Sequence, residues 1–281
     1  MSASSSTVVP PPMMIDWTEL PLELTSLILL RLGAVEILEN AQKVCTQWRS
    51  ISKDPSIWRK IDMRDLGNRK KGDLDFGILC RHAVDRSQGG LLEINFGAFA
   101  TDELITYVAE RSRNLTSLGL GRFFKCVTKA GFMKAIEKLP FLETFELAHS
   151  GIILDLKAVG HACPRLKTLK INSLGLLAYI FSINSDDDDY ALGIAEAMPQ
   201  LRHLQLIGDR ITANGLKAIL DGCPHLEHLD LRKCFNINLA GNLEKQYLEG
   251  IKALRRLDDS TTDYPYDITV FKYGFVGLVN L

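Results

Sequence analysis

The stretch "CPHLEHLDL" (residues 223–231) contains the pattern from which the fold of this chain can be predicted. Leucine stands at the first, fourth and sixth positions of its last six residues, and the second half alternates between apolar and polar side chains. Such alternation is typical of a strand with one buried face. Ahead of the strand, Pro224 indicates the end of a helix, and Cys223 is small enough for a core position.

The same hexamer occurs six times along the chain, at intervals of 24 to 27 residues apart from one interval of 35. The copies are "LLEINF" (91–96), "LTSLGL" (115–120), "LETFEL" (142–147), "LKTLKI" (166–171), "LRHLQL" (201–206) and "LEHLDL" (226–231). One strand and one helix in so short a period cannot enclose a core alone, so the copies must stack as a solenoid. The pattern and period are those of leucine-rich repeats. We therefore predict an α/β horseshoe with parallel strands on the concave face and helices on the convex face.

Amphipathic stretches between the hexamers supply the helices. In "TANGLKAILDGC" (212–223), Leu216, Ile219 and Leu220 fall on one helical face. Thr212 is suited to cap the start of this helix, and Gly222 is a typical end signal. After the sixth hexamer, residues 234–257 are expected to form one more helix and an irregular last repeat.

The third, fifth and following positions of each hexamer should point away from the core, onto the concave face. Polar side chains dominate there, which fits either plain solvation or a surface that binds a protein. The candidate binding residues are Glu93, Asn95, Thr144, Glu146, Lys170, Asn172, His203, Gln205, His228, Asp230 and Arg232.

The interval of 35 residues contains "LGLLAYIFSINSDDDDY" (174–190), which reads as an insertion. A calcium site at residues 186–189 is disfavoured, because an EF-hand loop needs spaced ligands and a glycine. We expect a solvated loop whose last aspartate caps the following helix. His225 and His228 resemble a metal pair, but at a spacing of three in a strand they should point to opposite faces. No metal or cofactor is therefore expected.

Composition narrows the function further. The formal net charge of −1 disfavours nucleic acid as a partner, and no apolar stretch reaches the roughly 20 residues that a membrane span needs. The six cysteines include no C-x-x-C pair, which favours free buried thiols and a cytosolic or nuclear protein. Common nucleophile, phosphate-loop and dinucleotide motifs are missing, so a binding module is favoured over an enzyme.

Residues 15–62 do not follow the repeat. "LPLELTSLILLRL" (20–32) predicts a helix with Pro21 in its first turn, and two further helices are expected over 35–41 and 43–51. A unit of about 45 residues has a modest core, so some of its large apolar side chains should face a partner.

The ordered residues of this unit resemble the F-box. Its pattern is matched by Leu20–Pro21, Glu23, Val44–Cys45, Trp48–Arg49, Asp54–Pro55 and Trp58. With the repeats and the tail "RRLDDSTTDYPYD" (255–267), the chain is similar to the small plant-type F-box/leucine-rich-repeat proteins. The resemblance implies a non-catalytic substrate receptor of an SCF ubiquitin ligase. Such a receptor binds the adaptor Skp1, and through it cullin and a RING subunit, and holds an unknown protein substrate on its repeats.

Carried over by position, the resemblance implies adaptor contacts by a set of residues, some of which belong to the internal core instead. They are Leu20, Pro21, Leu24, Ile28, Val44, Cys45, Trp48 and Trp58. An interaction scaffold without ligase delivery is the alternative. A small-molecule co-receptor is disfavoured, because six or seven repeats close too short an arc for such a pocket.

These patterns divide the chain into five parts. We expect a leader over 1–14, the F-box over 15–62, a linker and first helical segment over 63–90, repeats over 91–257 and a tail over 258–281.

Overall fold

The computed structural model describes residues 20–64, 75–121, 126–148, 152–172, 188–237 and 250–264. The leader, residues 186–187, most of the expected helix after the sixth hexamer and the end of the tail lie outside these ranges.

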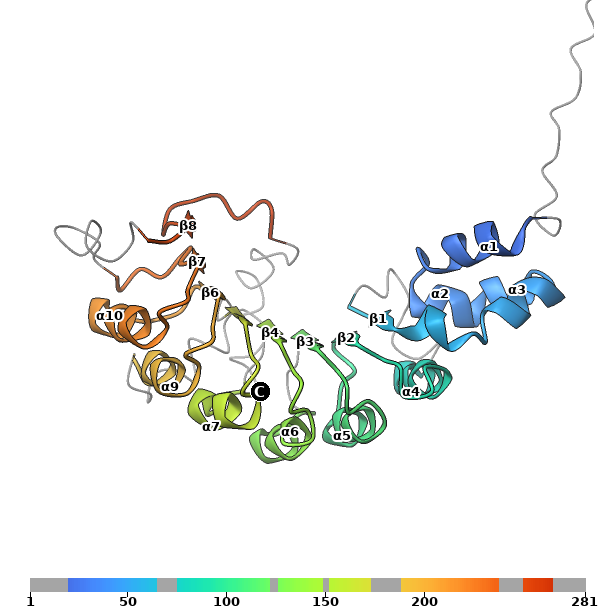
Figure 1. The fold of residues 1–281 in the computed structure, drawn as a ribbon, viewed down its shortest axis with the longest axis horizontal. Helices are drawn as coiled ribbons and strands as arrows, with labels where there is room; N and C mark the ends of the chain where they lie inside the picture. Colours follow the sequence, from blue (N-terminus) through green and yellow to red (C-terminus); the bar gives the residue numbers. More distant parts are fainter. Residues whose placement is uncertain are drawn as a thin grey trace, which may run out of the picture.

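The chain forms an arc with a sheet on its inner side and helices on its outer side (Figure 1). The described residues form one parallel sheet of eight strands in sequence order. The strands are β1 (Lys60–Asp62), β2 (Glu93–Phe96), β3 (Ser117–Gly121), β4 (Thr144–Ala148), β5 (Thr168–Asn172), β6 (His203–Ile207), β7 (His228–Asp230) and β8 (Ala253–Arg255). The predicted horseshoe is confirmed.

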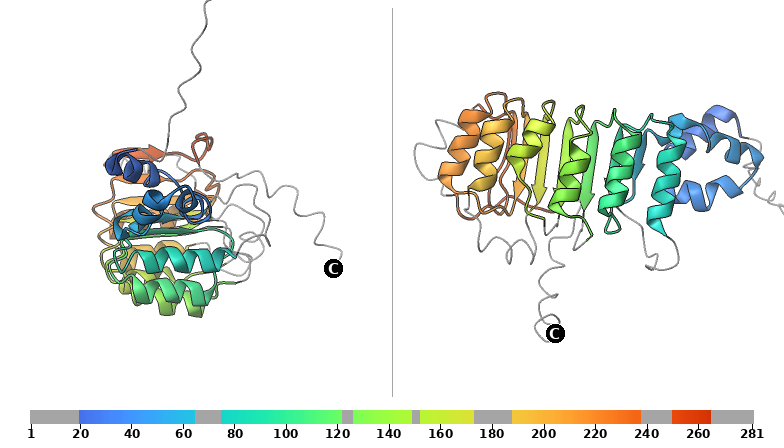
Figure 2. Two further views of the ribbon diagram at one scale, coloured as in Figure 1. Left: turned by 90° about the vertical axis from the view of Figure 1, so that its right-hand side faces the viewer. Right: turned by 90° about the horizontal axis from the view of Figure 1, so that it is seen from below.

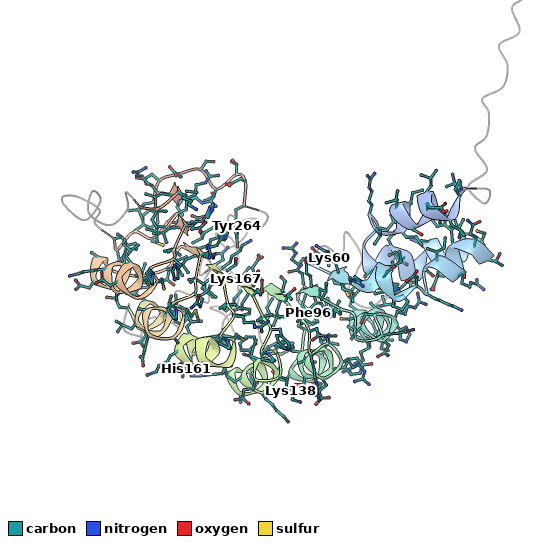
Figure 3. All side chains as sticks on the ribbon, in the orientation of Figure 1. Lys60, Phe96, Lys138, His161, Lys167 and Tyr264 are labelled. Atoms are coloured by element: carbon teal, nitrogen blue, oxygen red, sulfur yellow. The ribbon has the colours of Figure 1, made fainter. Side chains whose placement is uncertain are left out.

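The convex helices lie side by side along the outer face (Figure 2, right). They are α4 (Phe76–Arg86), α5 (Asp102–Arg111), α6 (Lys129–Ile136), α7 (Leu156–Ala162), α9 (Asp189–Ala197) and α10 (Ala213–Gly222). Lys138 and His161 lie on this outer side, whereas Lys60 lies on the inner side (Figure 3). The helix α4 lies within residues 63–90, the segment expected to hold a linker and a first helix.

The core follows the hexamer pattern. Leu204 of β6 is paired in register with Leu169 on one side and Leu229 on the other, and all three are buried. Cys163 and Cys223 fill the small core sites predicted for them, where their thiols approach the carbonyl oxygens of Leu139 at 3.8 Å and Met198 at 3.4 Å. Burial raises the pKa of Cys163 to about 12 and that of Cys223 to about 11.

The start and end of α10 lie where the sequence predicts. The Thr212 hydroxyl accepts a hydrogen bond from the Asn214 N–H at 3.1 Å, as an N-cap residue should. At the other end, a Cβ on Gly222 would lie 2.4 Å from the carbonyl oxygen of Ala195 in α9. Gly222 is therefore needed for the close approach of two helices, beyond any role in ending one.

The last aspartate of the run, Asp189, was expected to cap α9, and this was wrong: Asp189 is the first residue of the helix. The N-cap residue is Asp188, and its side chain does not cap its own helix. It accepts instead from the N–H (2.8 Å) and hydroxyl (2.6 Å) of Thr212, which begins the helix of the next repeat. Asp102 of α5 accepts in the same way from the N–H (2.8 Å) and hydroxyl (2.7 Å) of Thr128. Hydrogen bonds from a threonine to an aspartate of the preceding helix therefore join neighbouring repeats.

The N-terminal unit consists of short helices. They are α1 (Leu22–Leu29), α2 (Ala34–Glu39), the 3-10 turn η1 (Ala41–Lys43), α3 (Thr46–Ile51) and the 3-10 turn η2 (Pro55–Trp58). Pro21 immediately precedes α1, in agreement with the sequence. The second and third helices are both shorter than expected, because η1 interrupts the chain between them.

This unit is continuous with the solenoid. Its last residues form β1, which pairs with β2 and so begins the sheet. Arg86 of α4 donates to the Gln42 side chain at 2.8 Å and to the Ser52 carbonyl oxygen at 3.3 Å. Its guanidinium also lies 5.4 Å from the centre of the Trp58 ring. Burial at this junction lowers the pKa of Arg86.

Candidate functional site

A row of leucines on α1 is exposed to solvent. Leu24, Leu27 and Leu30 follow at intervals of three, so they share one side of the helix, and their exposed fractions are 49%, 55% and 56%. Leu22 (58%), the first residue of the helix, is also exposed, and outside the helix Val44 (49%) is a further exposed apolar residue of this unit. We call the four exposed leucines the apolar surface of α1.

The opposite side of α1 faces inward. Thr25 and Leu29 are completely buried, and Ile28 is partly covered. The Gln47 side chain of α3 donates to the Leu20 carbonyl oxygen at 2.8 Å, which holds the segment before α1 against the unit. The helix is therefore apolar on two sides, and only one of them is covered by this chain.

The structure separates the eight expected adaptor residues into three groups. Pro21, Leu24 and Val44 are exposed, and Leu20, Ile28 and Cys45 are half-buried. The third group, Trp48 and Trp58, corrects the expectation of adaptor contacts, because both side chains lie in the core with exposed fractions of 7% and 1%. The Trp58 indole N–H donates to the Ser52 carbonyl oxygen at 2.9 Å, so this ring has its partner inside the protein.

Sequence reasoning missed Leu22, Leu27 and Leu30 as contact candidates. The signal was present, because apolar residues surround α1 on all sides instead of forming one stripe. A helix of that kind must be covered on more than one face.

The expected binding residues of the repeats lie on the inner side of the arc, with two corrections. Asn172 and Arg232 have exposed fractions of 4% and 3% and are not available to a partner. His228 is exposed, and the others are partly exposed: Glu93, Asn95, Thr144, Glu146, Lys170, His203, Gln205 and Asp230.

Ion pairs occupy the N-terminal end of this concave surface. Lys60 and Glu93, partners in register, form an ion pair with 2.7 Å between nitrogen and oxygen. Arg64 binds Asp62 at 2.5 Å and reaches to within 3.9 Å of the Glu146 carboxylate on β4.

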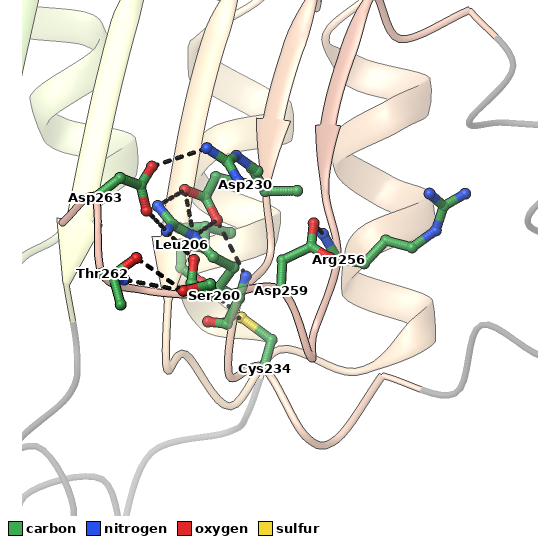
Figure 4. A network of polar contacts seen from close by, with 10 residues as sticks. Leu206, Asp230, Cys234, Arg256, Asp259, Ser260, Thr262 and Asp263 are labelled. Carbon is green, nitrogen blue, oxygen red and sulfur yellow. Dashed lines mark hydrogen bonds and ion pairs between the residues drawn. The ribbon is translucent and has the colours of Figure 1, made fainter.

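A second network closes the C-terminal end (Figure 4). Arg232 donates to Asp230 at 2.6 Å, to the Ser260 carbonyl oxygen at 2.7 Å and to Asp263. Arg255 of β8 also donates to Asp263, at 2.8 Å. Hydrogen bonding to Arg232 is the main reason that the pKa of Asp263 is lowered. The segment around residues 260–263 is therefore fastened over the last strands, and this is why Arg232 is buried.

The middle of the concave surface is different. The side chains of Ser117, Thr144, Thr168, Lys170 and Gln205 form no hydrogen bond or ion pair with another described residue. Beside them, the rings of His203 and His228 lie edge to face with 4.3 Å between centroids. Burial, and then the proximity of His228, lower the pKa of His203.

The described parts of the chain contain no group of three or more His, Cys, Asp or Glu side chains placed to hold a metal ion. None of the helices in these parts is long and apolar enough to span a membrane.

Comparison with known proteins agrees with this architecture. The model of the F-box-like family matches residues 17–64. The chain is 59% identical to F-box/LRR-repeat protein 21 of Arabidopsis thaliana over 263 residues, covering 90% of this chain and 85% of that protein. It is 52% identical to F-box protein SKIP19 of Arabidopsis thaliana over 251 residues, covering 88% and 79%.

A solved structure shows the same fold. The chain resembles a chain of the yeast Rad7–Elc1 complex with a TM-score of 0.54 and 16% identity, over 86% of this chain and 63% of that one. Exposed leucines on a short helical unit, a parallel-sheet arc and relatives of this similarity agree with one another. The chain therefore belongs to the plant-type F-box/leucine-rich-repeat proteins.

Proposed function

We propose that this chain is the substrate-recognition subunit of an SCF-type ubiquitin ligase. Its F-box binds a Skp1-like adaptor and, through it, a cullin and a RING subunit in the cytosol or nucleus. Its repeats hold a target protein, which the complex marks with ubiquitin for degradation by the proteasome. The chain itself performs no chemical step and acts by raising the local concentration of target lysines near the charged E2.

The observation that carries this proposal is the apolar surface of α1. Four leucines at about half exposure on so short a helical unit are costly to leave in water. A partner groove that covers them recovers this free energy, and large apolar side chains at the centre of an interface commonly dominate binding.

The junction with the solenoid supports the delivery role. Because β1 belongs to the sheet and Arg86 joins α4 to the F-box, the adaptor-binding surface and the concave surface are held in a fixed relation. A bound target would then be held at a defined distance from the adaptor, as delivery of ubiquitin requires.

The test is co-purification of the full chain with a Skp1 adaptor from the same plant. Replacing Leu27 with aspartate places a charge within the apolar surface of α1 and should abolish recovery of the adaptor. Leu192→Asp is the matched control, because Leu192 is equally exposed (56%) but lies on the convex helix α9. Equal recovery with both variants would show that the adaptor does not use this surface.

A second measurement separates delivery from scaffolding. Proteins captured by the wild-type chain but not by Leu27→Asp should include the adaptor and cullin. Targets should accumulate on the wild-type chain when the proteasome or cullin neddylation is inhibited. If adaptor binding is normal and no captured protein responds to either inhibitor, the chain is an interaction scaffold instead.

A further inference from the structure

The centre of the concave surface has side chains that the chain itself does not use. We define the central concave strip as the outward-facing residues of β3 to β7 without a hydrogen bond or ion pair to another described residue. They are Ser117, Thr144, Thr168, Lys170, His203, Gln205 and His228. Ion-paired residues bound the strip on both sides, at Lys60–Glu93 and at Arg232–Asp230.

Most charged side chains on the described strands have a partner of opposite charge, and one does not. Among the described strand residues, each carboxylate has a cation within 4 Å: these are Asp62, Glu93, Glu146 and Asp230. Lys60 and Arg255 have anionic partners. Lys170 is the exception among the strand lysines and arginines. Its register partner Glu146 forms its ion pair with Arg64 instead.

The strands on the two sides of Lys170 differ in their outward side chains. On the adjacent strand β4 these are Thr144 and Glu146, and the strand beyond it, β3, carries only the short Ser117 and Gly119. On the other side, β6 presents the larger His203 and Gln205. A peptide segment can therefore approach the sheet over Ser117, Gly119 and Thr144, beside the Glu146–Arg64 pair, and place a side chain against the ammonium group of Lys170. The hydroxyl groups of Thr144 and Thr168 are hydrogen-bond donors beside it.

We propose that the target protein presents an anionic side chain to Lys170, in a segment that lies on the central concave strip. An aspartate, a glutamate or a phosphorylated residue supplies the required charge. This proposal rests on the proposed function for the origin of the ligand, because the ligand is a segment of the target.

Selection from a bead-bound peptide library tests the proposal. Four arms share random flanks and differ at the central residue, which is aspartate, phosphoserine, serine or lysine. The probe is the purified full chain, co-expressed with its adaptor. We expect the wild-type chain to retain the aspartate or phosphoserine arm about fivefold more than the serine arm, the upper value for one partly exposed ion pair. The arm that is preferred identifies the source of the charge.

Charge reversal makes the test specific to one residue. Lys170→Glu should lose the preference for anionic arms and retain the lysine arm above the serine arm, a gain that an unfolded protein could not show. Lys217→Glu makes the same change of charge on the convex helix α10 and should keep the wild-type preference.

Two results would overturn the proposal. Equal retention of the four arms by the wild-type chain is one, and an anionic preference that survives in Lys170→Glu is the other. Leu27→Asp distinguishes a failure of the proposed function. If that variant, purified alone, keeps the anionic preference while the wild-type chain recovers no adaptor, the anion site stands and the ligase assignment fails.

Discussion

Replacing Arg86 with alanine removes the side chain that joins the F-box to the first convex helix. The substitution deletes the hydrogen bonds to Gln42 (2.8 Å) and Ser52 (3.3 Å) and the contact with the Trp58 ring. A hydrogen bond from a charged group contributes about 1.5–3 kcal/mol and a half-buried cation–π contact about 1 kcal/mol. The cost of burying the guanidinium, which lowers the pKa of Arg86, offsets part of this gain. We therefore expect a net loss of about 2 kcal/mol.

Urea denaturation followed by circular dichroism measures this loss, and hydrogen exchange locates it. A loss of about 2 kcal/mol corresponds to roughly 30-fold faster exchange of protected amides. The effect should appear at Ser52, whose N–H donates to Trp48, and be much smaller at Cys223 in the last convex repeat, because solenoid contacts are between neighbours.

Arg111→Ala is the matched control for this prediction. Arg111 also lies over an aromatic ring, 3.7 Å from the centre of Tyr107, but its side chain is 46% exposed. Its removal should cost less than about 1 kcal/mol. If the two variants lose the same free energy of unfolding, or if exchange at Ser52 is unchanged in Arg86→Ala, the junction does not depend on Arg86 as argued.

Three further predictions follow from the packing and the charges. Gly222→Ala should destabilise the chain by about 1–3 kcal/mol, despite the better helix propensity of alanine, because the new Cβ meets backbone atoms of α9. Gly33→Ala should be tolerated, because a Cβ there would have nothing within 4 Å, and thermal melting of the two variants compares their stabilities. Asp263 has a lowered pKa, so its stabilising effect is present above the unfolded value and is lost as pH falls through the folded value. The difference in stability between the wild-type chain and Asp263→Asn should therefore shrink between about pH 5 and pH 2, and an unchanged difference in pH-dependent urea titrations would contradict it. Finally, iodoacetamide at pH 8 should modify the exposed Cys126 well before Cys163 or Cys223, whose pKa values are about 12 and 11; peptide mass spectrometry that found equal rates would refute the burial of these thiols.

The hexamers predicted their strands well because a half-buried strand needs an apolar residue at every second position. Six of the eight described strands coincide with hexamers. The strand β1 was not predicted, because Lys60–Asp62 contains a single inward residue, Ile61, and follows a motif assigned to another unit. A first helix was expected somewhere within 63–90, but the bounds of α4 could not be predicted, because no hexamer precedes it to mark the repeat.

The site was harder to predict than the fold. A motif identifies Trp58 but does not say whether its ring faces a groove or the core. The ring is buried, and it lies near Arg86 in a helix that follows 28 residues later in the chain. The partner of Asp188 could not be read from the sequence either, because it belongs to the next repeat and is set by how closely α9 and α10 pack. The burial of Arg232 depends in the same way on a segment that returns over the sheet from residues 260–263.

The pairing of β1 with β2 has a consequence for exchanging parts between related F-box/leucine-rich-repeat proteins. A repeat array cut after residue 62 would expose the backbone edge of β2 and the helix face of α4 that now contacts α2 and η2. Exposed strand edges of this kind promote aggregation, and solenoids need a capped end to stay soluble. The F-box is thus the cap of its own repeat array. A functional chimera would have to exchange residues 60–90 together with the F-box, or supply an equivalent strand and helix at the start of the other protein's repeats.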